Sequence, residues 1–580
     1  MTASNMHAGF TVSSFFKNHN INTVFTLCGG HISPILVGCE SEGIDIIEVR
    51  DEVSTVFAAD ATSRLTNSIG VAIVTAGPGV TNTITAIKNA QLAQSPLILI
   101  GGAAATLLRG KGSLQDIDQM ALIKPHVKSA ISVTKARDIT PSLTNALNTA
   151  ISGVPGPVFV ELPIDLLYPE QSIREQHESQ LPSNGIMGKV MSWYVDRHLT
   201  DMFSSKKSSI KIQKNKIVLG RQKDIDNAAL TIVNAKKPVI LLGNQVTQNK
   251  EALPQFLKNL NKLSIPTYTS GMSRGCFSEN DIFFMRHNRK HALKNADVVL
   301  TVGVPLDFRL GYGFSINSSA KIIAINKSKK DINQNRKPFI SIHGDPTRAI
   351  CEIGKIINPP KCNEWTRELN ALEEKRDSEI IQQSELKTDF VNPIKLCTTI
   401  NKLLDNDSIL IADGGDFVGT AAYTVRPKGP LSWLDPGPFG TLGVGGGFAL
   451  GAKSAFKHKE VWIIYGDGAC AFSLAEFDTF VRHNLPVIAI VGNDASWQQI
   501  AREQVDMLGS PIGTNLANTA YHQVAIGYGG KGYAVDDPNE LDSVLLQAKE
   551  DAKNGHPVLV NVRIGKTDFR KGSILSLIHI

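Results

Sequence analysis

Short apolar runs alternate with longer stretches of helical periodicity along most of the chain. In the first part, the runs are TVFTL, IDIIEV, VAIVTA, PLILIGG and GPVFVELP, with helix-like stretches at 53–66 and 81–93. The same alternation returns between about 226 and 355, in PVILLGN, DVVLTVG and KIIAIN, and again beyond 390, in SILIADG, EVWIIYGDG, PVIAIVGND and PVLVNV. Such a rhythm is typical of parallel sheets covered by helices. The pattern therefore predicts an α/β protein with three doubly wound parallel-sheet domains, at 1–180, 226–360 and 391–580.

Two linkers of different composition join the predicted domains. The first, 181–225, is basic and contains KVMSWYVDRHLTDMF, whose apolar positions predict a one-sided amphipathic helix. We favour docking of this helix against a neighbouring domain, with attachment to a membrane surface as the alternative. The second linker, 361–390, contains a charged, helix-prone stretch at 364–387.

Composition excludes several classes of protein. The 580 residues are 42% hydrophobic and 20% charged, which fits an ordinary globular chain and excludes a disordered or fibrous one. The net charge is only +6, and the densest basic run, 206–223, carries no aromatic residue, so we expect no nucleic-acid partner. No apolar run approaches the roughly 18 residues of a membrane span, and the start lacks a signal-peptide pattern.

The seven cysteines are scattered along the chain without a CxxC pair. This spacing opposes both a disulfide framework and a zinc cluster, and it indicates a reducing compartment. We therefore expect an intracellular, cytoplasmic protein without a membrane span.

The strongest local motif is a strand that ends in Gly466-Asp467-Gly468, followed after 24 residues by a strand that ends in Asn493-Asp494. Because ligands bind beyond the carboxyl ends of parallel strands, the two loops are expected to converge. The Asp467 carboxylate, the Asn493 amide and the backbone oxygen of Ala495 form a set of hard ligands suited to Mg²⁺. The glycines also match a dinucleotide fingerprint, but Asp467 would repel a pyrophosphate unless a cation stood between them.

This motif resembles the cofactor motif of thiamine-diphosphate enzymes. The preceding loop, 440–452, is similar to the segment that holds the bent cofactor in the acetolactate synthase branch. The resemblance implies that Gly440, Thr441 and Leu442 contact the cofactor, with Leu442 as the apolar wedge below its rings. It also implies cofactor contacts for the segment Gly466, Asp467, Gly468 and Ala469, and a diphosphate-binding role for the domain at 391–580. The family often has methionine at position 442 and proline near 447, so this chain departs from the pattern there.

The first domain carries the other half of the resemblance, which implies that it binds the pyrimidine. Its motifs are GGH at 29–31, VRDE at 49–52 and TAGPGVTN at 75–82. By this match Glu52 bonds N1′ of the aminopyrimidine and promotes deprotonation of the thiazolium C2. The match also implies that Gln115 faces the substrate, although its neighbours Leu114 and Asp116 differ from the family pattern. His31 follows the double glycine and is a candidate for contact with the reacting carbonyl or oxyanion.

The resemblance covers about residues 8–573 and is strongest to the acetolactate synthase-like proteins that are also described as 2-hydroxyacyl-CoA lyases. Phrases such as LCGGHISPIL, VTAGPGVTNT and LDPGPFGTLGVG carry it. It implies a lyase that converts a 2-hydroxyacyl-CoA to formyl-CoA and an aldehyde one carbon shorter. The alternatives are an acetolactate synthase, which would decarboxylate the 2-keto acid pyruvate, and a non-catalytic regulatory subunit.

The central domain bears on this choice, because related synthases bind FAD there and related lyases bind a nucleotide. The strand KIIAIN ends in Asn326, where an acidic residue is frequent, which argues against an FAD requirement. Arg274 and Arg309 are candidate phosphate contacts, with ordinary surface ion pairs as the alternative.

The resemblance also implies a homodimer or homotetramer, with each cofactor bound between two subunits. Close relatives carry an anchor for the endoplasmic reticulum membrane, so association with that membrane is a further expectation.

Overall fold

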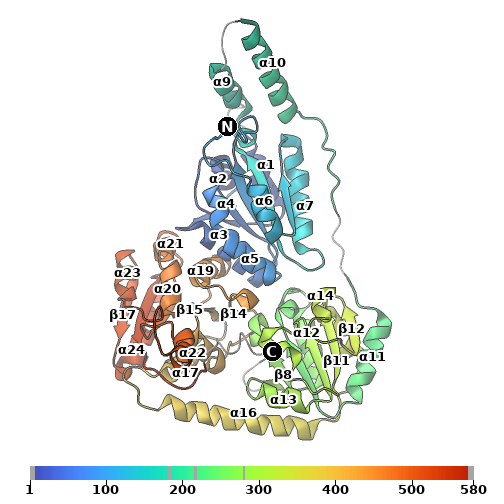
Figure 1. The fold of residues 1–580 in the computed structure, drawn as a ribbon, viewed down its shortest axis with the longest axis vertical. Coiled ribbons are helices and arrows are strands. Elements are labelled where there is room, and N and C mark those ends of the chain that lie inside the picture. The colour runs from blue at the N-terminus through green and yellow to red at the C-terminus, as the bar shows by residue number, and fades with distance from the viewer. Residues whose placement is uncertain (1–6, 181–184, 214–217, 278–280, 572–580) are drawn as a thin grey trace. The chain divides into compact units, whose positions relative to one another are not determined.

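The computed structural model describes residues 7–180, 185–213, 218–277 and 281–571. The chain divides into two compact units, Met1–Lys216 and Ile217–Ile580, the second of which contains the central and C-terminal domains (Figure 1). The predicted linker positions 181–184 and 214–217 lie outside the described residues, as do the outer ends of the first and last predicted domains. Among the described residues, each predicted domain contains one six-stranded parallel sheet, which confirms the expected fold class.

The sheet of the first unit has the strand order β2-β1-β3-β4-β6-β5. Its strands are β1 (Thr23–Thr26), β2 (Asp45–Glu48), β3 (Gly70–Val74), β4 (Leu97–Ala103), β5 (Ser129–Ser132) and β6 (Pro157–Pro163). Its helices are α1 (Gly9–Asn18), α2 (Ser33–Ser41), α3 (Glu52–Leu65), α4 (Pro78–Asn82), α5 (Ile84–Leu92), α6 (Gln119–Ile123), α7 (Ile139–Ile151), α8 (Ile164–Leu167), α9 (Glu170–Gln180) and α10 (Gly185–Met202). Strands β3, β4 and β6 are buried at every position, because helices cover both faces. The strand order reverses between β1 and β3, so the loops after these strands flank the expected ligand crevice.

The central sheet has the order β12-β11-β10-β7-β8-β9. Its strands are β7 (Pro238–Leu242), β8 (Thr267–Thr269), β9 (Phe284–Met285), β10 (Val298–Val302), β11 (Lys321–Asn326) and β12 (Ile340–His343). Its helices are α11 (Gln222–Val233), α12 (Leu253–Leu263), α13 (Arg289–Asn295), α14 (Lys329–Ile332) and α15 (Pro346–Ile356). Alternate strand residues enter two separate hydrophobic cores, so this sheet is also covered on both faces.

The C-terminal sheet has the order β14-β13-β15-β16-β18-β17. Its strands are β13 (Ile409–Asp413), β14 (Trp433–Leu434), β15 (Val461–Gly466), β16 (Ile488–Asn493), β17 (Lys531–Val535) and β18 (Val558–Arg563). Its helices are α17 (Pro393–Leu403), α18 (Asp416–Thr424), α19 (Val444–Ala455), α20 (Asp467–Ser473), α21 (Glu476–Arg482), α22 (Gln498–Leu508), α23 (Tyr521–Gly527) and α24 (Leu541–Lys553). The order reverses between β13 and β15, next to the strand that ends in Gly466.

Both linker segments contain the helices that the sequence predicts. The charged stretch forms α16 (Asn363–Ser384), and its residues Trp365 and Leu369 pack into the core of the central domain. The amphipathic stretch forms α10, whose last turns bury Leu199 and Met202 in the core of the first unit. This docking confirms the favoured interpretation for the end of the helix.

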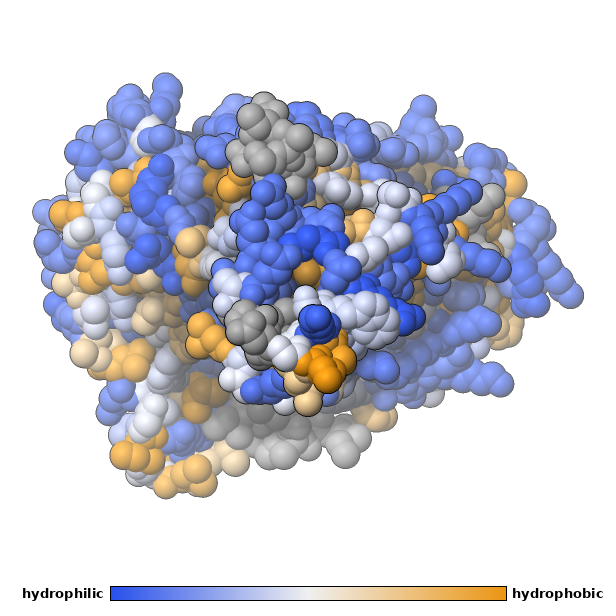
Figure 2. Space-filling view, turned by 90° about the horizontal axis from the view of Figure 1, so that it is seen from above, coloured by the Kyte–Doolittle hydropathy of each residue, from blue (hydrophilic) through white to orange (hydrophobic). Residues whose placement is uncertain are grey.

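The first turns of α10 lie at the surface instead. Their exposed apolar residues are Ile186, Met187, Val190, Met191, Trp193 and Tyr194. On the face that Figure 2 shows, hydrophobic side chains form separate patches among hydrophilic ones. Within the described ranges, no helix combines the length and the apolar character that crossing a membrane requires.

Candidate active site

The loops that follow β13, β15 and β16 meet at the reversal point of the C-terminal sheet. They line a small cavity of about 50 Å³ whose lining includes Gly414, Gly415, Asp467, Asp494 and Trp497. The backbone N–H of Ser496 donates a hydrogen bond to Oδ2 of Asp467 at 3.2 Å. The structure therefore brings the Gly-Asp-Gly motif and the loop after Asn493 together, although 24 residues separate the two motifs in the sequence.

Asp467 is a buried carboxylate that accepts hydrogen bonds from backbone N–H groups. Its side chain is 4% exposed, and its Oδ1 accepts the N–H of Gly468 at 2.7 Å. Burial raises the pKa of Asp467, while the backbone hydrogen bonds lower it. Burial and the charge of Asp467 also raise the pKa of the neighbouring Asp494 to about 7. Asp467 is buried and Asp494 is half-buried, and a divalent cation beside them would offset the repulsion between the two acids.

Asn493 and Ala495 are the other two residues that the sequence predicts as oxygen ligands. The amide nitrogen of Asn493 donates at 3.2 Å to Asn518, Thr519 and Asn561, which fixes the orientation of the side chain. Its Oδ1 lies on the other side and accepts the N–H of Ala495 at 3.2 Å.

The backbone of Ala495 has a positive φ of 53°, and its carbonyl accepts the N–H of Leu516 at 2.7 Å. A second lone pair of that carbonyl remains for a metal ion. No group of three or more His, Cys, Asp or Glu side chains suited to a metal occurs in the described part of the chain. The candidate site instead consists of one carboxylate, one amide oxygen and one backbone oxygen, which suits Mg²⁺ completed by water and phosphate oxygens.

Glycines at this site allow close backbone approach. Gly414 has a φ of 150°, and a Cβ built on it would lie 2.8 Å from the backbone nitrogen of Gly466. A Cβ on Gly468 would lie 2.3 Å from the ring of Trp497. The ring therefore covers Gly468 and holds the first turn of α20 in place, a role that the sequence did not assign to Trp497.

The loop that carries Gly440, Thr441 and Leu442 is anchored by a buried acid. Gly440 has a φ of 66°, and Thr441 and Leu442 are half-buried just before α19. Asp413, at the end of β13, accepts the N–H groups of Gly443 at 3.1 Å and Gly445 at 2.8 Å. Burial raises the pKa of Asp413 to about 7, although these hydrogen bonds lower it.

In the first unit, Glu52 is the first residue of α3 and is half-buried. The preceding Asp51 caps the helix by accepting the N–H of Val53 at 3.2 Å, so the two acids have different roles. Asn82 Nδ2 donates to Oε2 of Glu52 at 3.0 Å. The TAGPGVTN motif therefore contacts the predicted catalytic acid directly.

His31 and Gln115 converge on Thr75 of the same motif. Thr75 Oγ1 lies 3.0 Å from Nδ1 of His31 and 3.4 Å from Oε1 of Gln115. Burial lowers the pKa of His31, so its imidazole is neutral near pH 7. Gln115 has a positive φ of 61°, which is uncommon for a residue other than glycine and is often found at functional sites.

Two further residues near this loop were missed by sequence reasoning. Gln119 accepts the N–H of Gly77 at 3.2 Å and donates to Glu161 at 2.9 Å. With Gln115 and Arg109, both line a cavity of about 310 Å³ at the end of β6. Glu161 stands in the apolar run PVFVELP, and a charged residue within a buried strand was the available signal.

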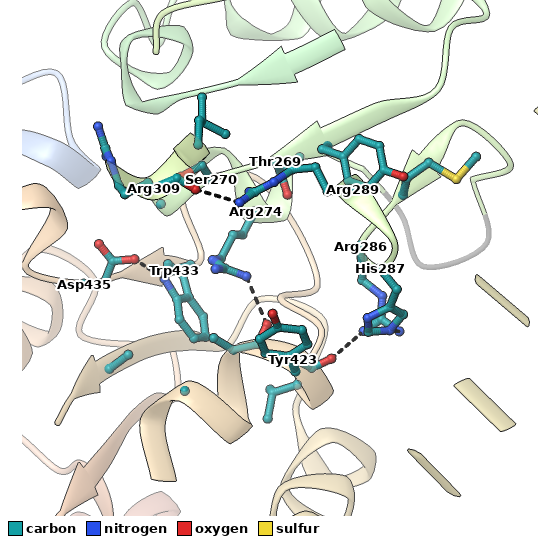
Figure 3. A pocket seen from close by; sticks show the side chains of 18 of the residues that line it. Thr269, Ser270, Arg274, Arg286, His287, Arg289, Arg309, Tyr423, Trp433 and Asp435 are labelled. Atoms are coloured by element: carbon teal, nitrogen blue, oxygen red, sulfur yellow. Dashed lines mark hydrogen bonds between the residues drawn. The ribbon is translucent and has the colours of Figure 1, made fainter. Parts of the chain in front are cut away.

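The second unit also contains a large basic pocket of about 700 Å³ between the central and C-terminal domains. Figure 3 shows Arg274, Arg286, Arg289 and Arg309 around this pocket, together with Tyr423 and Trp433. Arg309 forms an ion pair with Asp307 at 2.6 Å. In the described chain no carboxylate forms an ion pair with Arg274 or Arg289, and burial lowers the pKa of both.

Several buried polar atoms around this pocket lack a hydrogen-bond partner in the described structure. They are Nε of Arg274, the hydroxyl of Tyr268 and Nδ1 of His287. Buried polar atoms are rarely left unsatisfied unless a ligand, ion or water bonds them. The pocket therefore suits an anionic ligand, and Arg274 fits the predicted phosphate contact better than Arg309 does.

Comparison with known proteins assigns cofactor binding to the same two domains that carry the Glu52 and Asp467 motifs. Residues 6–122 match the family model described as thiamine pyrophosphate enzyme, N-terminal TPP binding domain. Residues 225–353 and 413–562 match the central domain and the C-terminal TPP binding domain of the same enzymes.

Similarity to individual proteins extends over nearly the whole chain. The chain is 48% identical to 2-hydroxyacyl-CoA lyase 2 of Danio rerio, over 98% of this chain and 93% of the relative. It is 43% identical to 2-hydroxyacyl-CoA lyase 2 of Homo sapiens, over 99% and 92%. It is 33% identical to the acetolactate synthase large subunit IlvG of Mycobacterium tuberculosis, over 97% and 96%. The chain therefore belongs to the thiamine pyrophosphate enzyme family and is a thiamine-diphosphate-dependent enzyme of the lyase branch.

Proposed function

We propose that the protein cleaves 2-hydroxyacyl-CoA to formyl-CoA and an aldehyde that is one carbon shorter. The 2-hydroxyl group loses its proton, and the bond between C1 and C2 breaks to release the aldehyde. The electron pair left on C1 takes up a proton, so that formyl-CoA forms without an oxidant or a reductant. When bound, thiamine diphosphate would supply the nucleophilic carbon and the electron sink that this cleavage needs.

The basic pocket is the observation that carries this proposal. A CoA thioester has phosphate groups far from its reacting carbon, and arginines are the side chains that bind phosphate best. Arg274 and Arg289 line the pocket and form no ion pair with a carboxylate among the described residues, although Asp435 also lies in the lining. Pyruvate, the substrate of an acetolactate synthase, has no phosphate that would occupy such a pocket. Binding energy from the remote phosphates can also raise the rate at the reacting carbon.

The end of β11 in the central domain bears on FAD. The side chain of Asn326, at the end of β11, accepts hydrogen bonds from Gln245 at 2.8 Å and from the N–H of Ser328 at 2.8 Å. We therefore expect no FAD requirement, because the acidic residue that is frequent at this position is absent and its place is occupied by an amide network.

For the cofactor, we propose that Asp467, Asn493 and the carbonyl of Ala495 hold Mg²⁺ against the diphosphate. The segment Gly440, Thr441, Leu442 would lie under the rings, and the segment from Gly466 to Ala469 would contact the diphosphate. Glu52 would share a proton with N1′ of the pyrimidine while Asn82 holds its other oxygen.

In the first unit, His31 and Gln115 are proposed to act on the substrate. The neutral imidazole of His31 is able to accept or donate a hydrogen bond at the reacting carbonyl, since its pKa is lowered by burial. Gln115 would orient the substrate through its amide group. Both side chains are held by Thr75, so the hydroxyl of this residue sets their spacing.

The protein is proposed to work as a homodimer or homotetramer inside the cell. Glu52 and Asp467 belong to separate compact units, and a cofactor bound between two subunits would use one from each. All seven cysteines are free, which supports a reducing, cytoplasmic compartment.

A two-substrate assay tests the proposed reaction. The protein, supplied with thiamine diphosphate and Mg²⁺, is incubated either with a long-chain 2-hydroxyacyl-CoA or with pyruvate, and the products are identified by mass spectrometry. We expect formyl-CoA and the shortened aldehyde from the first, with no acetolactate from the second. Acetolactate from pyruvate without formyl-CoA from the thioester would favour the synthase instead.

A further inference from the structure

One carboxylate on the linker helix α16 joins three basic side chains at the edge of the basic pocket. Asp377 Oδ2 accepts from Nη2 of Arg426 at 2.6 Å. Its Oδ1 accepts from Arg286 and lies 3.3 Å from Nε2 of His287. The three partners come from two segments of the second unit, since Arg286 and His287 follow β9 and Arg426 follows α18.

Glu373, one helical turn before Asp377, fixes the backbone of the same segment. Its carboxylate accepts the N–H of Arg286 at 3.1 Å and the N–H of His287 at 2.7 Å. Residues four apart lie on the same face of a helix, so α16 presents both acids to the segment after β9. Backbone and side chain of Arg286 are therefore both held by one face of α16.

The carboxylate of Asp377 pairs with two arginines that repel each other. Burial and the charge of Arg426 lower the pKa of Arg286, which reports the repulsion between them. Burial on its own would raise the pKa of Asp377, but the hydrogen bond from His287 and the two arginines lower it to about 2. The carboxylate is thus ionised at any pH at which the enzyme would be assayed.

The pocket nevertheless keeps an excess of positive charge. Arg286 and Arg426 share the charge of Asp377, and the charges of Glu373 and Asp435 act on Arg286 and Arg274. Lys290, Arg289 and Arg309 also line the pocket, so its basic side chains outnumber these carboxylates. An anion that enters it therefore finds donors that are already in place and are only partly neutralised.

We propose that Asp377 is a positioning residue for substrate binding: it holds Arg286 and Arg426 at the pocket so that their remaining N–H groups bind the phosphates of the CoA moiety. This inference rests on the proposed function, because it takes the ligand to be a CoA thioester. It assigns to the linker helix a role in specificity for the phosphorylated end of the substrate, in addition to joining two domains.

Calorimetric titration of the cofactor-loaded protein with CoA, and with pantetheine, which lacks the phosphates, tests this role. Asp377→Asn keeps the size of the side chain but replaces one carboxylate oxygen by an NH2 group. This group cannot accept a hydrogen bond, so the arginine that it faces is released from α16. We expect CoA to bind at least about tenfold more weakly, with pantetheine binding changed less than twofold. KM for the CoA thioester should rise by a similar factor, while kcat changes little.

Two further variants keep the test decisive. Glu379→Gln removes an exposed ion pair with Arg376 on the same helix and should leave CoA affinity unchanged. In an Arg426→Gln background, Asp377→Asn should have a smaller effect on CoA affinity, because one of the two arginines that Asp377 holds is gone. Melting temperature and thiamine diphosphate binding of each variant report whether the fold is intact.

The outcomes separate this inference from the proposed function. Unchanged or tighter CoA binding by the Asp377→Asn protein, or an equal loss for pantetheine, would overturn the positioning role. An undiminished effect in the Arg426→Gln background would also overturn it. If the unaltered protein bound no CoA at all, the proposed function itself would fail.

Discussion

Replacement of Gly468 by alanine is a sharp test of how the diphosphate loop is built. The added Cβ would lie 2.3 Å, 2.4 Å and 2.7 Å from three atoms of the Trp497 ring. Contacts below about 3.0 Å do not occur, so the ring or the first turn of α20 must move by more than half an ångström. Such overpacking costs about 1–3 kcal/mol.

An opposing term acts at the same position. Gly468 is the second residue of α20, and alanine is favoured over glycine in a helix by up to about 1 kcal/mol. We therefore expect a net loss of about 1–2 kcal/mol in the free energy of unfolding. In a Trp497→Ala background the clash is absent, so the same change should be neutral or stabilising.

Urea denaturation of the cofactor-free protein measures all four members of this double-mutant cycle. Gly527→Ala serves as the control, because a Cβ at this exposed position of α23 meets no atom within 4 Å. The control variant should be at least as stable as the unaltered protein. An equal loss from Gly468→Ala with and without the Trp497 ring would refute the steric explanation.

Three further predictions concern the cofactor site. Glu52→Gln should lower the rate of formyl-CoA formation about 10²- to 10⁴-fold while thiamine diphosphate stays bound; an unchanged rate would remove Glu52 from the chemistry. Thiamine diphosphate with Mg²⁺ at a hundredfold excess over Kd should stabilise the protein by about 2.7 kcal/mol in thermal unfolding, and Asp467→Asn should lose most of this gain. The pKa of Asp413 is raised by burial to about 7, so the folded state of the cofactor-free protein binds the extra proton and its stability falls as pH rises from about 4 to 7. The difference in unfolding free energy between Asp413→Asn and the unaltered protein should change with pH across this window, and a constant difference would contradict the assignment.

The sequence predicts the inner strands better than the outer ones. Apolar runs such as PLILIGG and PVIAIVGND became β4 and β16, which are buried on both faces. The missed strands β5, β9, β12, β14 and β17 all lie at sheet edges, and β8 lies next to one. Edge strands are short or partly polar, as Ser129–Ser132 illustrates, so they lack the continuous apolar pattern that identifies a buried strand.

The candidate site divides in a similar way. Asp467 and the Asn493 loop were predicted together because both follow strands of one parallel sheet, where position in the fold follows from the motif. Residues that act through long-range contacts carried no such signal: Asp377 is one of many charges on α16, and its partners lie 49 to 91 residues away. Trp497 was likewise close in sequence to the site, but only the packing against Gly468 shows what it does.

A mixed dimer tests most directly whether one thiamine diphosphate is served by Glu52 of one subunit and Asp467 of another. The Glu52→Gln and Asp467→Asn chains are co-expressed with different tags, and dimers that carry both tags are isolated. Each such dimer would have one intact site and one doubly altered site, so we expect about half of the formyl-CoA activity of the unaltered dimer. Activity as low as that of either variant alone would contradict a site shared between subunits.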